Sequence, residues 1–166
     1  MEEIAAAAGV ARQTVYAHYS SREALLAAVL DLITGEAAAS LDAVDVGGGS
    51  AAAALRRWLE ASWSLIERYP VLLNPAVAAG VPGEDQYQQH APIMTRLIEL
   101  FERGQRTGEF DDRLPVTWLI NTVIGLGHNA GEEVRSGRMS AADAGRAYRD
   151  SVLRVCVRPP AGPAEP

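Results

Sequence analysis

Apolar residues recur at intervals of three and four through almost the whole sequence, and no segment alternates apolar and polar residues for long. The first spacing places apolar side chains on one face of an α-helix, whereas a half-buried strand requires the second. We therefore predict an all-α fold. Glycine and proline residues divide the pattern into separate helices. The expected ranges are 2–8, 12–18, 21 to about 39, 51–69, 70 to about 80, 93–106, 115 to about 133, and 140 to about 157.

The 166 residues fit one compact domain, or a small domain attached to a larger one. The run Gly47-Gly48-Gly49-Ser50 predicts a flexible break between a head, residues 1–46, and a helical domain, residues 51–157. Residues 81–92, with two prolines and a polar run, predict a loop. The tail, residues 158–166, holds four of the nine prolines and is expected to be disordered.

The formal net charge is −6, and all 15 basic residues are arginine. This balance excludes a protein that coats nucleic acid or anionic membrane through bulk charge, so any such binding must be local. The single cysteine, Cys156, excludes a disulfide framework and a cysteine-rich zinc module. The longest uncharged runs are too short and too interrupted to span a bilayer, and no export signal opens the chain. The expected location is the cytoplasm, with no membrane partner.

The two short helices at the start of the chain carry the chemistry. Helices of this length do not persist alone, so they must pack against each other and against the next helix. Ala5 and Ala8 allow a close crossing, Gly9 supplies the positive φ of a tight turn, and Val15 fills the angle between the helices. This pattern predicts a helix-turn-helix whose second helix exposes groups suited to the DNA major groove. The exposed groups belong to Arg12, Gln13, Thr14, Tyr16 and His18.

The same residues give the sequence a resemblance to the TetR family of bacterial transcriptional regulators. The matching segments are Ile4-Ala5, Ala8-Gly9-Val10, Thr14-Val15-Tyr16-Ala17-His18-Tyr19 and Ser21-Arg22-Glu23-Ala24-Leu25-Leu26. Where members of the family commonly have phenylalanine and lysine, this chain has Tyr19 and Arg22. Both replacements preserve the chemical character of the position, an aromatic ring in the first case and a positive charge in the second. The resemblance is close over about the first 33 residues. Beyond them it is architectural, through the connector that contains Gly104 and Gly108 and through two closing helices.

The resemblance implies a role for each exposed residue. Arg12 and Gln13 would face base edges, where arginine pairs with guanine and glutamine with adenine. Contacts to phosphates would come from Thr14, Tyr16, His18 and Arg22. Simpler interpretations stay open, because Tyr16 and His18 could be packing residues, and Arg12 and Gln13 could form a solvated face.

Members of the family begin with an additional, usually basic helix, and this chain starts at Met1 directly on the next one. Residues 1–30 carry two arginines and three glutamates, so their net charge is negative and does not attract a polyanion such as DNA. Either the true start lies upstream, or the head is truncated and its DNA binding is weakened. We favour the upstream start, because Val10, Val15, Tyr19 and Leu25 would otherwise be partly uncovered.

In the resembling family the helical body encloses a small-molecule pocket, and the last two helices pair across a two-fold axis. A largely apolar pocket here would suit a lipophilic or aromatic effector, although an ordinary packed core explains the same residues. The pocket candidates are Trp58, Ser62, Trp63, Tyr69, Met94, Leu97, Phe101 and Trp118. Small residues at 125, 127, 130 and 131 permit close helix approach, and we expect a homodimer through the last two helices.

No catalytic motif rises above chance, so we do not expect an enzyme. His128 and Glu132 could share a metal, but two ligands are a weak signal, and we expect neither a metal site nor a cofactor. The predicted function is a ligand-responsive, DNA-binding transcriptional regulator, a repressor released from its double-stranded DNA operator by a small-molecule effector. The alternative is a small-molecule-binding or dimerisation module that has lost DNA binding through N-terminal truncation.

Overall fold

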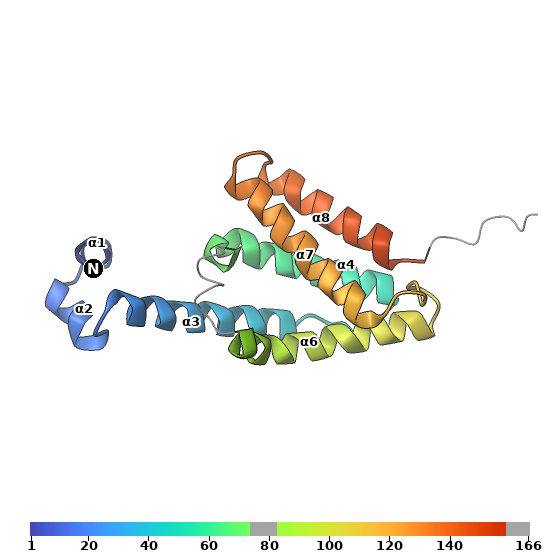
Figure 1. The fold of residues 1–166 in the computed structure, drawn as a ribbon, viewed down its shortest axis with the longest axis horizontal. Coiled ribbons are helices and arrows are strands. Elements are labelled where there is room, and N and C mark those ends of the chain that lie inside the picture. Colours follow the sequence, from blue (N-terminus) through green and yellow to red (C-terminus); the bar gives the residue numbers. More distant parts are fainter. Residues whose placement is uncertain (74–82, 159–166) are drawn as a thin grey trace, which may run out of the picture. The chain divides into compact units, whose positions relative to one another are not determined.

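The structure is a computed structural model that describes the backbone of residues 1–73 and 83–158 and the side chains of residues 1–71 and 94–158. Within these residues the chain forms seven α-helices and one 3-10 helix (Figure 1). The helices are α1 (Glu2–Ala7), α2 (Arg12–His18), α3 (Arg22–Asp42), α4 (Ala51–Arg68), η1 (Pro70–Leu73), α6 (Gly83–Arg106), α7 (Val116–Arg135) and α8 (Ala141–Cys156). The prediction of an all-α fold is confirmed.

Serine side chains cap three of the helices at their first turns. Ser21 Oγ accepts a hydrogen bond from the backbone N–H of Ala24 at 3.1 Å, at the start of α3. Ser50 and Ser140 cap α4 and α8 in the same way, each across 3.1 Å. Each serine satisfies a donor that the start of a helix leaves without an intrahelical partner. These caps explain why most helix boundaries fall close to their predicted places.

The predicted loop at residues 81–92 is wrong, because α6 begins at Gly83 and runs without interruption to Arg106. The polar run in this segment shows no apolar periodicity, but glutamate and glutamine are good helix formers and a solvated helix can be polar. Residues 74–80 of the short helix expected after Pro70 lie outside the described residues, as do residues 81–82 and 159–166.

The first residue of the predicted tail, Arg158, belongs to the folded part of the chain. Its backbone N–H donates to the Glu109 carbonyl at 2.9 Å, and its guanidinium donates to Asp112 at 2.7 Å. These bonds lie next to an isolated antiparallel bridge between Phe110 and Val157. The end of α8 is therefore attached to the connector between α6 and α7.

The chain divides into two compact units, Met1–Glu36 and Ala37–Pro166, and the division lies within α3. The predicted boundary lay further along the chain, at the glycine run. The assignment of separate functions to residues 1–46 and 51–157 stays a prediction, and the two units are described here one at a time.

The first unit has a very small interior. Its buried hydrophobic residues are Ala5 and Val15, on α1 and α2, at 3% and 8% exposure. Gly9 makes the turn between these helices with a φ of +67°, a conformation that glycine adopts without strain, and the predicted role of this residue is confirmed. The crossing of two short helices thus depends on one small and one branched side chain.

Several apolar side chains of the first unit are exposed. Val10 is 43% exposed, and Leu26, Val29 and Leu32 on α3 are 44%, 40% and 63% exposed. The apolar side chains of α3 at positions 26, 29 and 32 are therefore largely uncovered. Among the described helices, α3 alone is long and apolar enough to cross a membrane by length and composition. The core helices of soluble proteins meet the same criteria, so this property does not by itself place the chain in a membrane.

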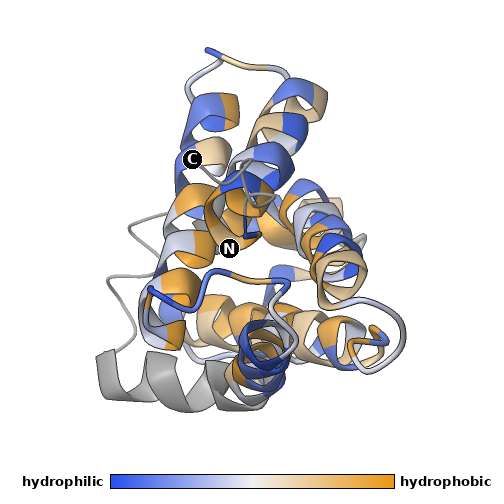
Figure 2. Cartoon of the chain, turned by 90° about the vertical axis from the view of Figure 1, so that its right-hand side faces the viewer, coloured by the Kyte–Doolittle hydropathy of each residue, from blue (hydrophilic) through white to orange (hydrophobic). Residues whose placement is uncertain are grey.

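The second unit packs α4, α6, α7 and α8 around one hydrophobic core. Figure 2 shows apolar residues, in orange, interspersed with hydrophilic residues, in blue, along the helices, as expected for amphipathic segments. The largest fully buried side chains are Leu55, Leu59, Leu97, Leu100, Phe101, Phe110, Leu119, Ile120, Val123, Val152 and Cys156.

Helical glycines let aromatic rings pack directly against a helix backbone. A Cβ atom at Gly104 would overlap the ring of Phe110, and one at Gly145 would overlap the indole of Trp63. A Cβ atom at Gly127 would lie 3.5 Å from Cε2 of Tyr148, which is ordinary contact. Of the small residues on α7, Gly127 therefore allows α7 to pack on α8 within one chain.

Arginine side chains hold the turn between α3 and α4. Arg57 donates to the main-chain carbonyls of Asp45 and Gly48, both at 2.8 Å. Arg96 and Arg103 of α6 donate to further carbonyls of the same turn. The break that the glycine run predicts as flexible is therefore a turn fixed by hydrogen bonds from charged donors, which are stronger than neutral ones.

The connector after α6 also reaches the start of α4. Glu109 accepts hydrogen bonds from the backbone N–H groups of Ala51 at 2.9 Å and Ala52 at 3.1 Å. These bonds, with Ala51 the largest contribution, lower the pKa of Glu109. A carboxylate at the positive end of a helix is favourable, so Glu109 joins two segments that are distant in the sequence.

We expect Gly104→Ala to lower the free energy of unfolding by about 1–3 kcal/mol, because the added methyl group must displace the Phe110 ring in a packed core. The matched control is Gly35→Ala in α3, where no heavy atom lies within 4 Å of the added Cβ. That change should leave stability unchanged or raise it by about 0.5–1 kcal/mol. Urea denaturation measures both values, and equal effects of the two variants would contradict the packing argument.

Candidate nucleic-acid interface

The helix α2 presents a polar face because only one of its seven residues, Val15, is buried. Each of the residues predicted to contact DNA is exposed. They are Arg12, Gln13, Thr14, Tyr16 and His18 on α2, and Arg22 at the start of α3. The structure thus brings the first five together on one short helix. Their individual contacts to bases and phosphates stay predictions.

The end of α2 is marked by two rings. His18 lies in the last turn, and its ring centroid is 6.5 Å from that of Tyr19, which is half-buried. The backbone N–H of Tyr19 donates to the Val15 carbonyl at 2.9 Å and closes the helix. Tyr19 is thus partly packed against the protein, while His18 stays accessible.

The guanidinium of Arg12 has two neighbours in the first unit. Its Nη1 donates to Oε1 of Glu2, on α1, at 2.5 Å, and the two side chains are 56% and 74% exposed. Its Cζ also lies 5.4 Å from the centroid of the Tyr16 ring. Sequence reasoning counted Glu2 only in the acidic balance of the head. No periodic signal connects residues 2 and 12, because the turn at Gly9 brings them together.

The residues predicted to line an effector pocket fall into three groups. Trp58, Ser62, Trp63, Leu97 and Phe101 are buried, and the four apolar ones belong to the core of the second unit. Tyr69 and Met94 are partly buried and pack against that core. Trp118 is 61% exposed and lies outside the core cluster. The structure therefore brings six of the eight predicted residues together in or against the core, buries Ser62, and leaves Trp118 apart.

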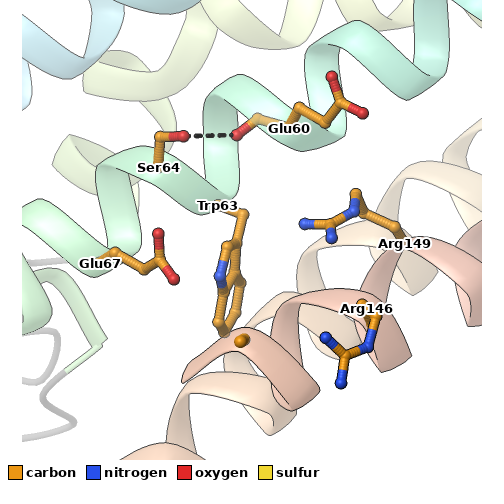
Figure 3. A pocket seen from close by; sticks show the side chains of 7 residues that line it. Glu60, Trp63, Ser64, Glu67, Arg146 and Arg149 are labelled. Carbon is orange, nitrogen blue, oxygen red and sulfur yellow. Dashed lines mark hydrogen bonds between the residues drawn. The ribbon is translucent and has the colours of Figure 1, made fainter. Parts of the chain in front are cut away.

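An open pocket of about 430 Å³ lies between α4 and α8 (Figure 3). Glutamates from α4 and arginines from α8 face it, so its lining is mainly charged rather than apolar. The lining residues are Glu60, Trp63, Ser64, Glu67, Ala142, Arg146 and Arg149. Of these lining residues, Trp63 alone was predicted from the sequence. Its Nε1 is buried and has no hydrogen-bond partner in the described part of the chain.

In the possible metal pair, the carboxylate of Glu132 is engaged by an arginine. His128 is exposed, and both carboxylate oxygens of Glu132 accept hydrogen bonds from Arg135, each at 2.6 Å. Across the described ranges no group of three or more His, Cys, Asp or Glu side chains is placed to hold a metal ion. Burial raises the pKa of the Cys156 thiol to about 12, so this cysteine stays protonated and is a poor nucleophile at neutral pH.

Large apolar side chains are exposed on the last two helices. Trp118 and Ile124 on α7 are 61% and 38% exposed, and Val155 on α8 is 39% exposed. Beside Ile124, Gly125 has no heavy atom within 4 Å of the position where a Cβ would stand. These exposed side chains are the candidates for a contact with another protein.

Three comparisons relate this chain to known proteins. Residues 1–29 match the model of the family described as "Bacterial regulatory proteins, tetR family". No curated protein matches the sequence significantly. Among solved structures, the chain is similar to the TetR family transcriptional regulator PfmR from Thermus thermophilus, with 24% identity and a TM-score of 0.69. That match covers 93% of this chain and 87% of PfmR.

Two further structures share the fold. The TetR-like transcriptional regulator LfrR from Mycobacterium smegmatis, solved in complex with proflavine, is 27% identical with a TM-score of 0.59, covering 90% of this chain and 81% of LfrR. A TetR family transcription regulator from Marinobacter aquaeolei is 16% identical with a TM-score of 0.64, covering 94% of this chain and 83% of its own. The chain is thus similar to TetR family regulators in its helix-turn-helix segment, residues 1–29, and it shares an all-α fold with solved structures of such regulators along most of its length.

Proposed function

We propose that the protein is a ligand-responsive repressor that reads its operator with α2. The observation that supports this function most directly is the face of α2, where every side chain except Val15 is exposed. A helix of this size fits the major groove, and its donors and acceptors match those of base edges and phosphates. The acidic net charge of the chain then requires that binding depends on these local contacts.

Within this function Arg12 and Gln13 read bases, while the other exposed polar residues fix the register through phosphates. Thr14, Tyr16 and His18 contribute from α2, and Arg22 contributes from the start of α3. Bidentate pairing of Arg12 with guanine would supply about 1–3 kcal/mol of discrimination against other bases.

The repressor acts as a homodimer through α7 and α8. Support comes from Trp118 and Ile124, which lie exposed on α7, and from Val155 on α8. Aromatic side chains are frequent at the energetic centre of protein interfaces. Two heads related by a two-fold axis enter successive major grooves when they are about 34–36 Å apart, so a modest change in their spacing releases the operator.

The effector is a lipophilic or aromatic small molecule that binds in the second unit, among the aromatic and apolar residues of α4 and α6. The complex of the similar regulator LfrR with proflavine supports this chemical class. Binding shifts α3 and with it the head, and a ligand does so only if it prefers the released state. We place this regulator in the cytoplasm.

One observation favours the alternative of a module without DNA binding. Arg12, the best candidate for base reading, is paired with Glu2, and the head is acidic overall. That module would form dimers and bind small molecules but would show no salt-dependent affinity for DNA. The next experiment separates the two functions.

We expect Arg12→Ala to weaken binding to the DNA that flanks the protein's own gene by about 1–3 kcal/mol, because a bidentate base contact is lost. An electrophoretic shift assay measures the change. The matched control is Arg56→Ala, an exposed arginine of α4 with the same charge and no ion pair among the described side chains. Equal losses in both variants would reject base reading by Arg12, and no shift with the full-length protein would reject the repressor.

We expect Trp118→Asp to convert the dimer to a monomer, because the change replaces an exposed apolar side chain of the proposed interface by a charge. Sedimentation equilibrium measures the mass of each species. The control is Ala142→Asp, an exposed position in the first turn of α8, where a carboxylate is favourable. The proposed interface is wrong if Trp118→Asp remains a dimer.

We expect proflavine to quench the tryptophan emission of the protein saturably, because Trp58 and Trp63 lie in the core that holds the effector. The control is Trp118→Phe, which removes the exposed indole outside the core cluster and should leave the saturable quenching in place. Loss of the quenching in this control, or quenching that does not saturate, would contradict an effector site in the core.

A further inference from the structure

The ion pair between Arg12 and Glu2 links the outer face of α2 to α1. Arg12 is the first residue of α2 and Glu2 the first residue of α1, and both side chains are mainly exposed. Glu3 follows Glu2 on the same short helix and is also exposed, but its side chain has no hydrogen bond or ion pair with the described residues. The first unit therefore holds two neighbouring glutamates, of which one contacts the base-reading arginine.

The contact engages the groups that DNA would need. A guanidinium offers five N–H donors in a planar fork, and pairing with guanine uses two of them toward O6 and N7. In the structure one terminal nitrogen of Arg12 already donates to Glu2 at 2.5 Å, and the ring of Tyr16 lies against the guanidinium at 5.4 Å. A phosphate that approaches Arg12 must replace the carboxylate and also meets its negative charge.

We propose that Glu2 is a specificity-determining residue, whose carboxylate competes with DNA for the Arg12 guanidinium and so suppresses binding to non-specific sequences. This proposal rests on the DNA-binding function proposed above. A single phosphate oxygen gains little from displacing Glu2, because it exchanges one ionic hydrogen bond for another. Guanine at the operator offers two neutral acceptors, which the carboxylate does not repel and which can accept from the N–H donors of Arg12 that Glu2 leaves unused. Glu2 thus lowers non-specific affinity more than operator affinity.

The test measures binding of the full-length protein to a duplex of random sequence by fluorescence anisotropy over a range of KCl concentrations. We expect Glu2→Gln to bind this duplex about two- to fivefold more tightly than the wild type, the size expected for an exposed ion pair. The slope of log affinity against log salt should also steepen by about 0.9, because Arg12 becomes free to neutralise one more phosphate.

Glu3→Gln is the matched control, since it removes the same charge from the neighbouring residue without freeing Arg12. Its salt slope should equal that of the wild type. A second check is Glu2→Gln in the Arg12→Ala background, where the slope should not change, because the two residues act through one contact. Circular dichroism verifies that each variant keeps its helices.

The outcomes separate this proposal from the proposed function. If the wild type binds DNA and Glu2→Gln has the same slope as Glu3→Gln, the role of Glu2 is rejected and the repressor stands. If Glu2→Gln binds random DNA more weakly, the carboxylate orients Arg12 for binding, and the competition is likewise rejected. If no form of the protein binds any duplex in a salt-dependent manner, both proposals fail.

Discussion

The crossing of α1 and α2 is the constraint on which the proposed DNA-reading surface depends. Neither helix is long enough to be stable alone, and the buried side chains that join them are Ala5 and Val15. An interior this small requires only one inward side chain from α2, which leaves the rest of that helix facing solvent. The polar surface and the marginal core of the head are therefore two consequences of the same packing. The positive φ at Gly9 sets the crossing, and it also brings Glu2 to Arg12.

Local signals made much of the fold predictable. Gly9 and the capping serines Ser21 and Ser140 act within a few residues of their own positions, so their effects can be inferred without knowledge of tertiary structure. The start of α6 was missed for the opposite reason, since its polar first turns carry no apolar periodicity to mark them as helical. The break between α3 and α4 was predicted, but the hydrogen bonds that fix it as an ordered turn were missed. Arg103 contacts it from far along the sequence, and a glycine run gives no sign of such distant donors.

Of the candidate sites, one could be predicted from local sequence and the others required the tertiary structure. The exposed face of α2 follows from helical periodicity once Val15 is assigned to the interior, so the sequence alone was sufficient to select it. The effector residues needed tertiary information, because a tryptophan on an amphipathic helix can face either the core or solvent. Trp63 and Trp118 show the two outcomes, at 4% and 61% exposure. The pairing of Glu2 with Arg12 could not be foreseen, because it depends on how two helices cross and on no repeat in the sequence.

The acidic balance of the chain has a physical meaning in this context. A genome presents a regulator with a vast excess of non-specific sites, so its performance depends on the ratio of specific to non-specific affinity more than on affinity itself. Attraction through bulk charge raises the affinity for every site, and a chain with a net charge of −6 gains little of it. Binding must then come from directional contacts of a few side chains, which only the correct base sequence satisfies together. An arginine that is already paired with a carboxylate applies the same principle to a single residue. The carboxylate repels a phosphate, whereas a neutral guanine can accept from the N–H donors that the carboxylate leaves unused.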